Sequence, residues 1–138
     1  MDIEADLSGE PTLAPTLSEI IPLILNGLVD GRVWQLSTPD DLPRDSGGIL
    51  PFIIWHRVGG QDGAFYDQTA PDHAHARVQI QCCARNAIVA ERLERQCMQA
   101  MLASIYTVGV YGSPVGAYDA ARKLHAPWRQ FSIWFRQS

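Results

Sequence analysis

The sequence predicts an α+β fold: a mainly antiparallel β-sheet with two main helices packed on one of its faces. Two stretches, 17–29 and 87–104, repeat apolar residues at helical spacing. Between and after them lie short runs rich in β-branched and aromatic residues. The resulting order is one helix, three strands, a second helix and two further strands, which is typical of α+β domains.

The chain is long enough for one domain with a hydrophobic core of its own. It has 138 residues, of which 46% are apolar and 19% are charged, and single domains commonly have about 100–150 residues. Residues 1–15 are polar, acidic and aperiodic, so we expect a flexible N-terminal tail ahead of a single domain over 16–138. No signal peptide and no apolar run of membrane-spanning length is visible. We therefore expect a soluble protein made in a reducing compartment, with no membrane partner.

Charge and cysteine content argue against several classes of function. Eleven Lys and Arg stand against fifteen Asp and Glu, a net charge of −4, whereas proteins that follow a phosphate backbone usually carry a basic patch. The three cysteines, Cys82, Cys83 and Cys97, form no CxxC pair. This number and spacing fit neither a secreted disulfide framework nor a zinc knuckle.

The first helix is predicted over 17–29, because apolar residues recur at helical spacing after the capping-box pattern Thr16-Leu-Ser-Glu19. The strand at 51–58 is the clearest one, since it is β-branched and aromatic throughout. A short strand is predicted at 32–36, a loop rich in proline and glycine at 37–48, and a long loop at 59–73.

The second half of the chain has the more regular patterns. Residues 74–84 alternate between apolar and polar side chains, as expected of a strand with one buried face. Asn86 can cap the amphipathic helix at 87–104. A strand is predicted at 105–111, an irregular segment at 112–127, and a last alternating strand at 128–136.

Each strand offers two sets of alternating positions. One set is apolar and is expected under the helices: Val78, Ile80, Phe131, Ile133 and Phe135. The other set mixes tryptophan, arginine and glutamine, a composition typical of protein–protein interfaces. From it we predict an assembly interface that comprises Trp55, Arg57, Arg77, Gln79, Trp128 and Trp134. Alternatively, a loop covers this face and its tryptophans are core, and a single bulge would exchange the two sets.

The sequence contains no constellation that indicates catalysis. His73-x-His75, with Asp67 and Asp72 nearby, could hold a metal ion, but no third ligand follows at a fixed spacing, so a solvated polar loop is favoured. Paired carboxylates, nucleophile motifs and phosphate-binding glycine loops are not found. We therefore assign no catalytic residue, no metal ion and no cofactor.

Three segments carry a resemblance to a known group of proteins. They are GRVW at 31–34, PFIIWHRV at 51–58 and RVQIQ at 77–81, followed by a helix and an aromatic last strand. In this order and spacing they resemble the tail-completion proteins of tailed bacteriophages and prophages, of the tail-terminator and head–tail joining group. The resemblance extends over about residues 16–136.

The resemblance implies a structural and not an enzymatic role. Such proteins form rings, commonly hexameric, that cap the tail tube, end its polymerisation and offer a surface for joining the head. It implies self-association, contacts with tail-tube and head–tail connector proteins, and a place in the tail or neck of a virion made in the bacterial cytoplasm. DNA would pass through such a ring without specific binding, which the acidic charge balance fits. Phe65 and Tyr66, in the long loop, are expected to contact a partner.

Two alternatives remain open at this point. One is a small metal-dependent α+β enzyme with Asp72, His73 and His75 as ligands. The other is a generic protein-binding module that uses the face around Trp55 and Trp134.

Overall fold

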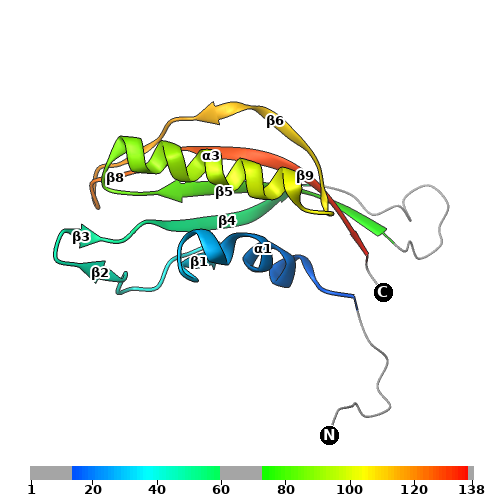
Figure 1. Cartoon of the computed structure of the whole chain (residues 1–138), viewed down its shortest axis with the longest axis horizontal. Coiled ribbons are helices and arrows are strands. Elements are labelled where there is room, and N and C mark those ends of the chain that lie inside the picture. The colour runs from blue at the N-terminus through cyan, green and yellow to red at the C-terminus, as the bar shows by residue number, and fades with distance from the viewer. Residues whose placement is uncertain (1–13, 60–72, 137–138) are drawn as a thin grey trace, which may run out of the picture.

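A computed structural model describes residues 14–59 and 73–136. It confirms the α+β fold, with a mainly antiparallel sheet and helices on one face (Figure 1). The main sheet has the order β1-β4-β5-β9-β6, in which β1 is parallel to β4 and the other neighbours are antiparallel. Its strands are β1 (Val33–Gln35), β4 (Phe52–Gly59), β5 (His73–Cys83), β6 (Thr107–Val115) and β9 (Trp128–Arg136).

Two short hairpins lie in segments for which the sequence predicted no strands. They are formed by β2 (Arg44–Asp45) with β3 (Gly48–Ile49), and by β7 (Tyr118–Asp119) with β8 (Leu124–His125). The prediction of irregular structure over 112–127 is thus wrong in part. β6 continues to Val115 through a register shift, and the second hairpin follows it.

The helices begin where the sequence predicted. The backbone N–H of Thr16 donates to the Glu19 carboxylate at 2.8 Å at the start of α1 (Leu17–Leu25), and a 3₁₀ turn, η2 (Asn26–Leu28), follows. The Asn86 side chain accepts the backbone N–H groups of Ile88 and Val89 at the start of α3 (Ala87–Ala103). No helix in the described part of the chain is long and apolar enough to cross a membrane.

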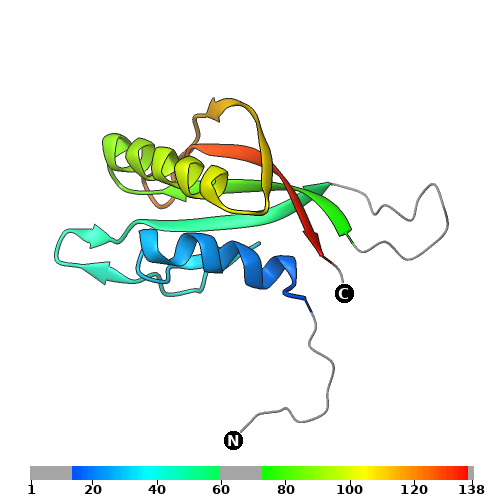
Figure 2. The same cartoon turned by 45° about the vertical axis from the view of Figure 1, so that its right-hand side comes forward.

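The main hydrophobic core lies between the sheet and the two helices, which run side by side on the same face (Figures 1 and 2). α1 contributes Ile21 and Leu25, and α3 contributes Leu93, Cys97 and Met101. From the sheet come Ile53, Trp55, Ala76, Val78, Ile80, Cys82, Phe131 and Ile133. These residues are shielded from water, so burial of their apolar surface supplies the main driving force for this fold.

The register corrects the predicted position of Trp55. Trp55 pairs with Ile80 and Ile53 pairs with Cys82, so both point toward the helices. Only 1% of the Trp55 surface is exposed, and placing this residue on the mixed face was wrong. Arg57 pairs with Val78 and therefore belongs to the same helix-side set, although it is exposed near the end of the strand.

A second, smaller cluster lies on the opposite face of the sheet. It comprises Leu42, Ile49, Phe52, Cys83, Leu124 and Ala126, with Trp34 and Ile54 packed against it. The two hairpins contribute Ile49 and Leu124, so they cover this end of the sheet. The alternative in which loops cover the mixed face is therefore realised at the end of the sheet where the two hairpins lie.

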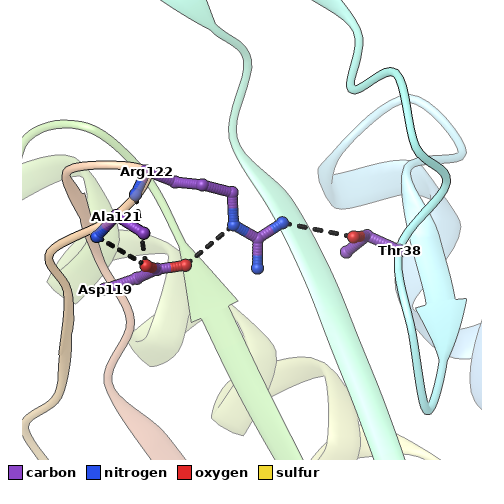
Figure 3. A network of polar contacts seen from close by, with 4 residues as sticks. All are labelled: Thr38, Asp119, Ala121 and Arg122. Atoms are coloured by element: carbon purple, nitrogen blue, oxygen red, sulfur yellow. Dashed lines mark hydrogen bonds and ion pairs between the residues drawn. The ribbon is translucent and has the colours of Figure 1, made fainter.

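A polar network fixes one hairpin to the loop that precedes β2 (Figure 3). Arg122 Nε donates to Asp119 Oδ2 at 2.7 Å, and Arg122 Nη1 donates to Thr38 Oγ1 at 3.2 Å. Asp119 Oδ1 accepts the backbone N–H groups of Ala121 and Arg122. These hydrogen bonds hold the pKa of the Asp119 carboxyl below its usual value.

Candidate interaction surface

Beyond the hairpins, no helix or hairpin within 14–59 and 73–136 covers the sheet face opposite the helices. Cross-strand pairing brings together side chains from β4, β5, β9 and β6 on this face. We call this surface the open face. It comprises His56, His75, Arg77, Gln79, Tyr111, Gln130, Ser132 and Trp134. Trp134 is 44% exposed and Tyr111 is 40% exposed, so two aromatic rings on this surface remain available to a partner.

Contacts within the open face hold Arg77 in place. Its guanidinium carbon lies 4.3 Å from the centroid of the Tyr111 ring, within cation–π range. Hydrogen bonds from Arg77 and Ser132 lower the pKa of the Tyr111 hydroxyl. Next to this pair, Gln130 Nε2 donates to Gln79 Oε1 at 3.4 Å. The cation is thus oriented before any partner arrives, which reduces the entropic cost of binding.

A second set of contacts orients Trp134. The ring of His75 lies 5.0 Å from the Trp134 ring, centroid to centroid, with an interplanar angle of 43°. His75 Nε2 is hydrogen-bonded to Ser132 Oγ, and the backbone carbonyl of His75 accepts Arg57 Nη2 at 3.1 Å. Trp134 therefore packs against a histidine that is itself held by hydrogen bonds, and part of the Trp134 ring remains exposed to solvent.

The charge of the main sheet differs in sign from that of the whole chain. None of its five strands contains an Asp or Glu, whereas Arg57, Arg77, Arg129 and Arg136 all lie in them. Arg129 is neutralised from α3, because its Nε lies 2.8 Å from Glu94 Oε2 in a largely buried ion pair. On the open face, no carboxylate among the described residues lies beside Arg77. The surface is therefore suited to receive a negatively charged group from a partner.

The structure places the predicted interface residues unequally. Arg77, Gln79 and Trp134 lie on the open face, as predicted. Trp128 pairs with Gln81 on the same side of the sheet and is half-buried near the hairpins, whereas Trp55 is core. Phe65 and Tyr66 lie outside the described residues. That this surface is an assembly interface stays a prediction.

Five members of the open face are absent from the predicted interface: His56, His75, Tyr111, Gln130 and Ser132. His75 was considered only as a metal ligand, although it stands two residues before Arg77 and thus shares its face. Ser132 has the same relation to Gln130 and Trp134. Tyr111 gave no signal, because β6 contains register shifts on both sides of its central segment.

The metal hypothesis stays untested. Asp67 and Asp72 lie outside the described residues, and only the backbone of His73 is placed. Within 14–59 and 73–136, no three His, Cys, Asp or Glu side chains come together as a possible metal site.

The cysteine side chains are not suited to nucleophilic chemistry. Burial raises the pKa of the Cys83 thiol to about 12. The pKa of the Cys82 thiol is raised by its hydrogen bond to Cys97, at 3.4 Å, and by burial. All three thiols are buried, so they pack as small apolar groups.

Comparison with known proteins shows a shared fold. No family model and no curated protein sequence matches the chain. Among solved structures, the chain resembles one from the "Virion of native gene transfer agent (GTA) particle", with a TM-score of 0.51 and 15% sequence identity. The match covers 81% of this chain and 84% of that chain. At this identity the likeness shows a shared fold, which is thus present in a component of a virion particle.

Proposed function

We propose that this chain is a structural protein of a phage-type virion. The observation that carries the proposal is the fold match, because it extends over most of both chains and the matched chain belongs to a virion particle. The open face supports it independently. This face presents Trp134, Tyr111 and Arg77, residue types that dominate the energetics of protein interfaces, rather than a cavity with catalytic groups.

We further propose that it acts as a tail-completion subunit, a tail terminator or head–tail joining protein. The order of the segments at 31–34, 51–58 and 77–81 supports this role. The chain would join copies of itself in a ring that caps the tail tube and contacts tail-tube and connector proteins. A ring needs two different patches on each subunit, and the open face is suited to be one of them. DNA would pass through the ring without specific binding.

The charges on the sheet bear on how such a ring would be oriented. Arg129 is paired with Glu94, but Arg77 is an exposed cation that has no carboxylate beside it in the part of the chain that the structure describes. A lumen lined by such cations would bind passing phosphates, since these contacts dominate protein–DNA affinity. We therefore place the open face at a contact between proteins and away from the lumen.

Deletion of the gene from the particle-producing genome tests this role. We expect electron micrographs to show filled heads without attached tails, together with free tails of abnormal length. A plasmid copy of the gene should restore complete particles, which controls for effects on neighbouring genes. Complete and infectious, or transfer-competent, particles from the deletion strain would contradict the proposal.

Ring formation needs a separate measurement. Native mass spectrometry of concentrated protein, with and without purified tail tubes, should show a closed oligomer with one mass or a complex of fixed stoichiometry on the tube end. A chain that stays monomeric in both samples would contradict the ring. If the deletion leaves particles intact while the open face still binds a protein, the binding-module alternative is favoured. Stoichiometric zinc, manganese or iron in the purified full chain would favour the enzyme alternative.

A further inference from the structure

Charge is unevenly distributed between residues 14–138 and the residues that precede them. Residues 14–138 contain all eleven Lys and Arg and eleven of the fifteen Asp and Glu, so this part of the chain carries no net charge. Residues 1–13 contain no Lys or Arg and four carboxylates, those of Asp2, Glu4, Asp6 and Glu10. An acidic segment is therefore tethered to a domain that is neutral overall and that exposes Arg77 on its open face.

The tether point lies beside the open face. Ala14 is half-buried and lines a hollow of about 430 Å³ together with Trp134 and Arg136. Trp134 is itself a member of the open face. Residues 1–13 thus join the domain next to the surface that has an exposed tryptophan and, among the residues that the structure describes, no carboxylate.

The length and pattern of the segment fit this surface. Thirteen extended residues reach up to about 43–47 Å, whereas five strands side by side span about 20 Å. If the segment is extended, Asp2, Glu4 and Asp6 fall on one side of it, because side chains alternate. Three carboxylates could then face the same surface.

We propose that residues 1–13 dock on the open face of their own chain, with carboxylates facing Arg77. Tethering favours this occupant, because a short linker gives an effective concentration in the millimolar range. Nucleic acid is disfavoured, since Arg77 already covers the ring of Tyr111 and the face offers few cations for phosphates. The docking does not depend on ring formation. In the proposed virion role, a neighbouring subunit or tail protein would have to displace the segment to use the face.

Paramagnetic relaxation in the full-length chain tests the docking. Ser8→Cys provides a site for a spin label, and the native cysteines are buried. The four Trp indole N–H signals serve as reporters in one spectrum. We expect the Trp134 signal to be lost and the Trp55 signal, from the core on the helix side, to be retained. High salt should restore the Trp134 signal, because the contact is electrostatic.

Charge variants identify the contact. Arg77→Glu should restore the Trp134 signal, and so should the triple variant Asp2→Asn, Glu4→Gln, Asp6→Asn, which leaves the folded domain unaltered. Arg92→Glu serves as the matched control, since Arg92 is exposed on α3 and lies away from the open face. A Trp134 signal that is unaffected by the spin label, or one that stays lost in the triple variant, would overturn the proposal.

A mixed sample distinguishes the chain's own segment from that of a second copy. It combines ¹⁵N-labelled chains that lack the spin label with unlabelled chains that carry it. Docking within one chain predicts an intact Trp134 signal in this sample. Loss of the signal there would assign the face to a second copy and overturn the proposal. None of these outcomes depends on the deletion phenotype, so failure of the docking and failure of the virion role are distinguishable.

Discussion

The sequence grouped Trp55 and Trp134 together, but replacing each by alanine should lower the free energy of unfolding by different amounts. Trp55 is 1% exposed and lies in the main core, so Trp55→Ala should cost about 3–5 kcal/mol of unfolding free energy. Trp134 is 44% exposed, and its ring packs against that of His75. Its aromatic contact is worth about 0.5–1.5 kcal/mol, so we expect Trp134→Ala to cost about 1 kcal/mol, or roughly 3–5 °C in Tm for a chain of this size.

Urea denaturation followed by far-UV circular dichroism measures both losses. Particle assembly in the complemented deletion strain measures function, and we expect Trp134→Ala to fold but to assemble poorly. Trp134→Phe is the matched control, because it keeps an aromatic ring over His75. The reasoning is refuted if the two alanine variants lose equal stability, or if Trp134→Ala assembles like the unmodified chain.

Three further predictions concern the described domain. Glu94→Gln should lower the free energy of unfolding, measured by urea denaturation, by about 3 kcal/mol, because it leaves the Arg129 cation buried without its counter-charge. A smaller loss than that caused by substituting an exposed residue of α3 would contradict this prediction. Burial raises the pKa of Cys83 to about 12, above its value of 9.0 in the unfolded chain. The thiol's contribution to stability is therefore complete below pH 9 and is lost as pH rises toward 12, so unfolding free energy should fall over that range, and less steeply in Cys83→Ala. Arg122→Ala removes the link between Asp119 and Thr38, which both lie near the surface, so we expect the free energy of unfolding to fall by less than about 1 kcal/mol. Amide hydrogen exchange in the β7–β8 hairpin should become faster. Unchanged exchange would show that the network does not hold this hairpin.

Local patterns were enough to place most of the elements. The strand predicted at 74–84 is β5 to within one residue at each end, and the helix at 87–104 is α3 with one residue fewer. These segments alternate cleanly or follow Asn86, so their signals come from neighbouring residues. The last strand, at 128–136, agrees with β9 at both ends.

The faces of the sheet could not be predicted from alternation alone. In β4, both sets of positions are apolar at the start of the strand: Ile53 and Trp55 face the helices, and Phe52 and Ile54 face the smaller cluster. A strand that is buried on both sides shows no alternation of apolar and polar residues from which its two faces could be assigned. The covering hairpins arise from segments rich in glycine and proline, whose long-range contacts cannot be read locally. The predicted interface therefore placed two residues, Trp55 and Arg57, on the wrong face and did not include Tyr111.

The distribution of apolar packing explains why the open face is a better candidate for function than the rest of the sheet. One face supplies the main core with α1 and α3, and the hairpins cover one end of the other with Phe52 and Leu124. The surface that remains presents Trp134, Tyr111 and Arg77 to solvent. Stability needs no exposed aromatic ring there, because the two clusters already bury the strands that carry this surface. In the proposed assembly role, exposed aromatics beside an oriented cation would instead provide binding energy to a partner, so changes on this surface should separate assembly from folding.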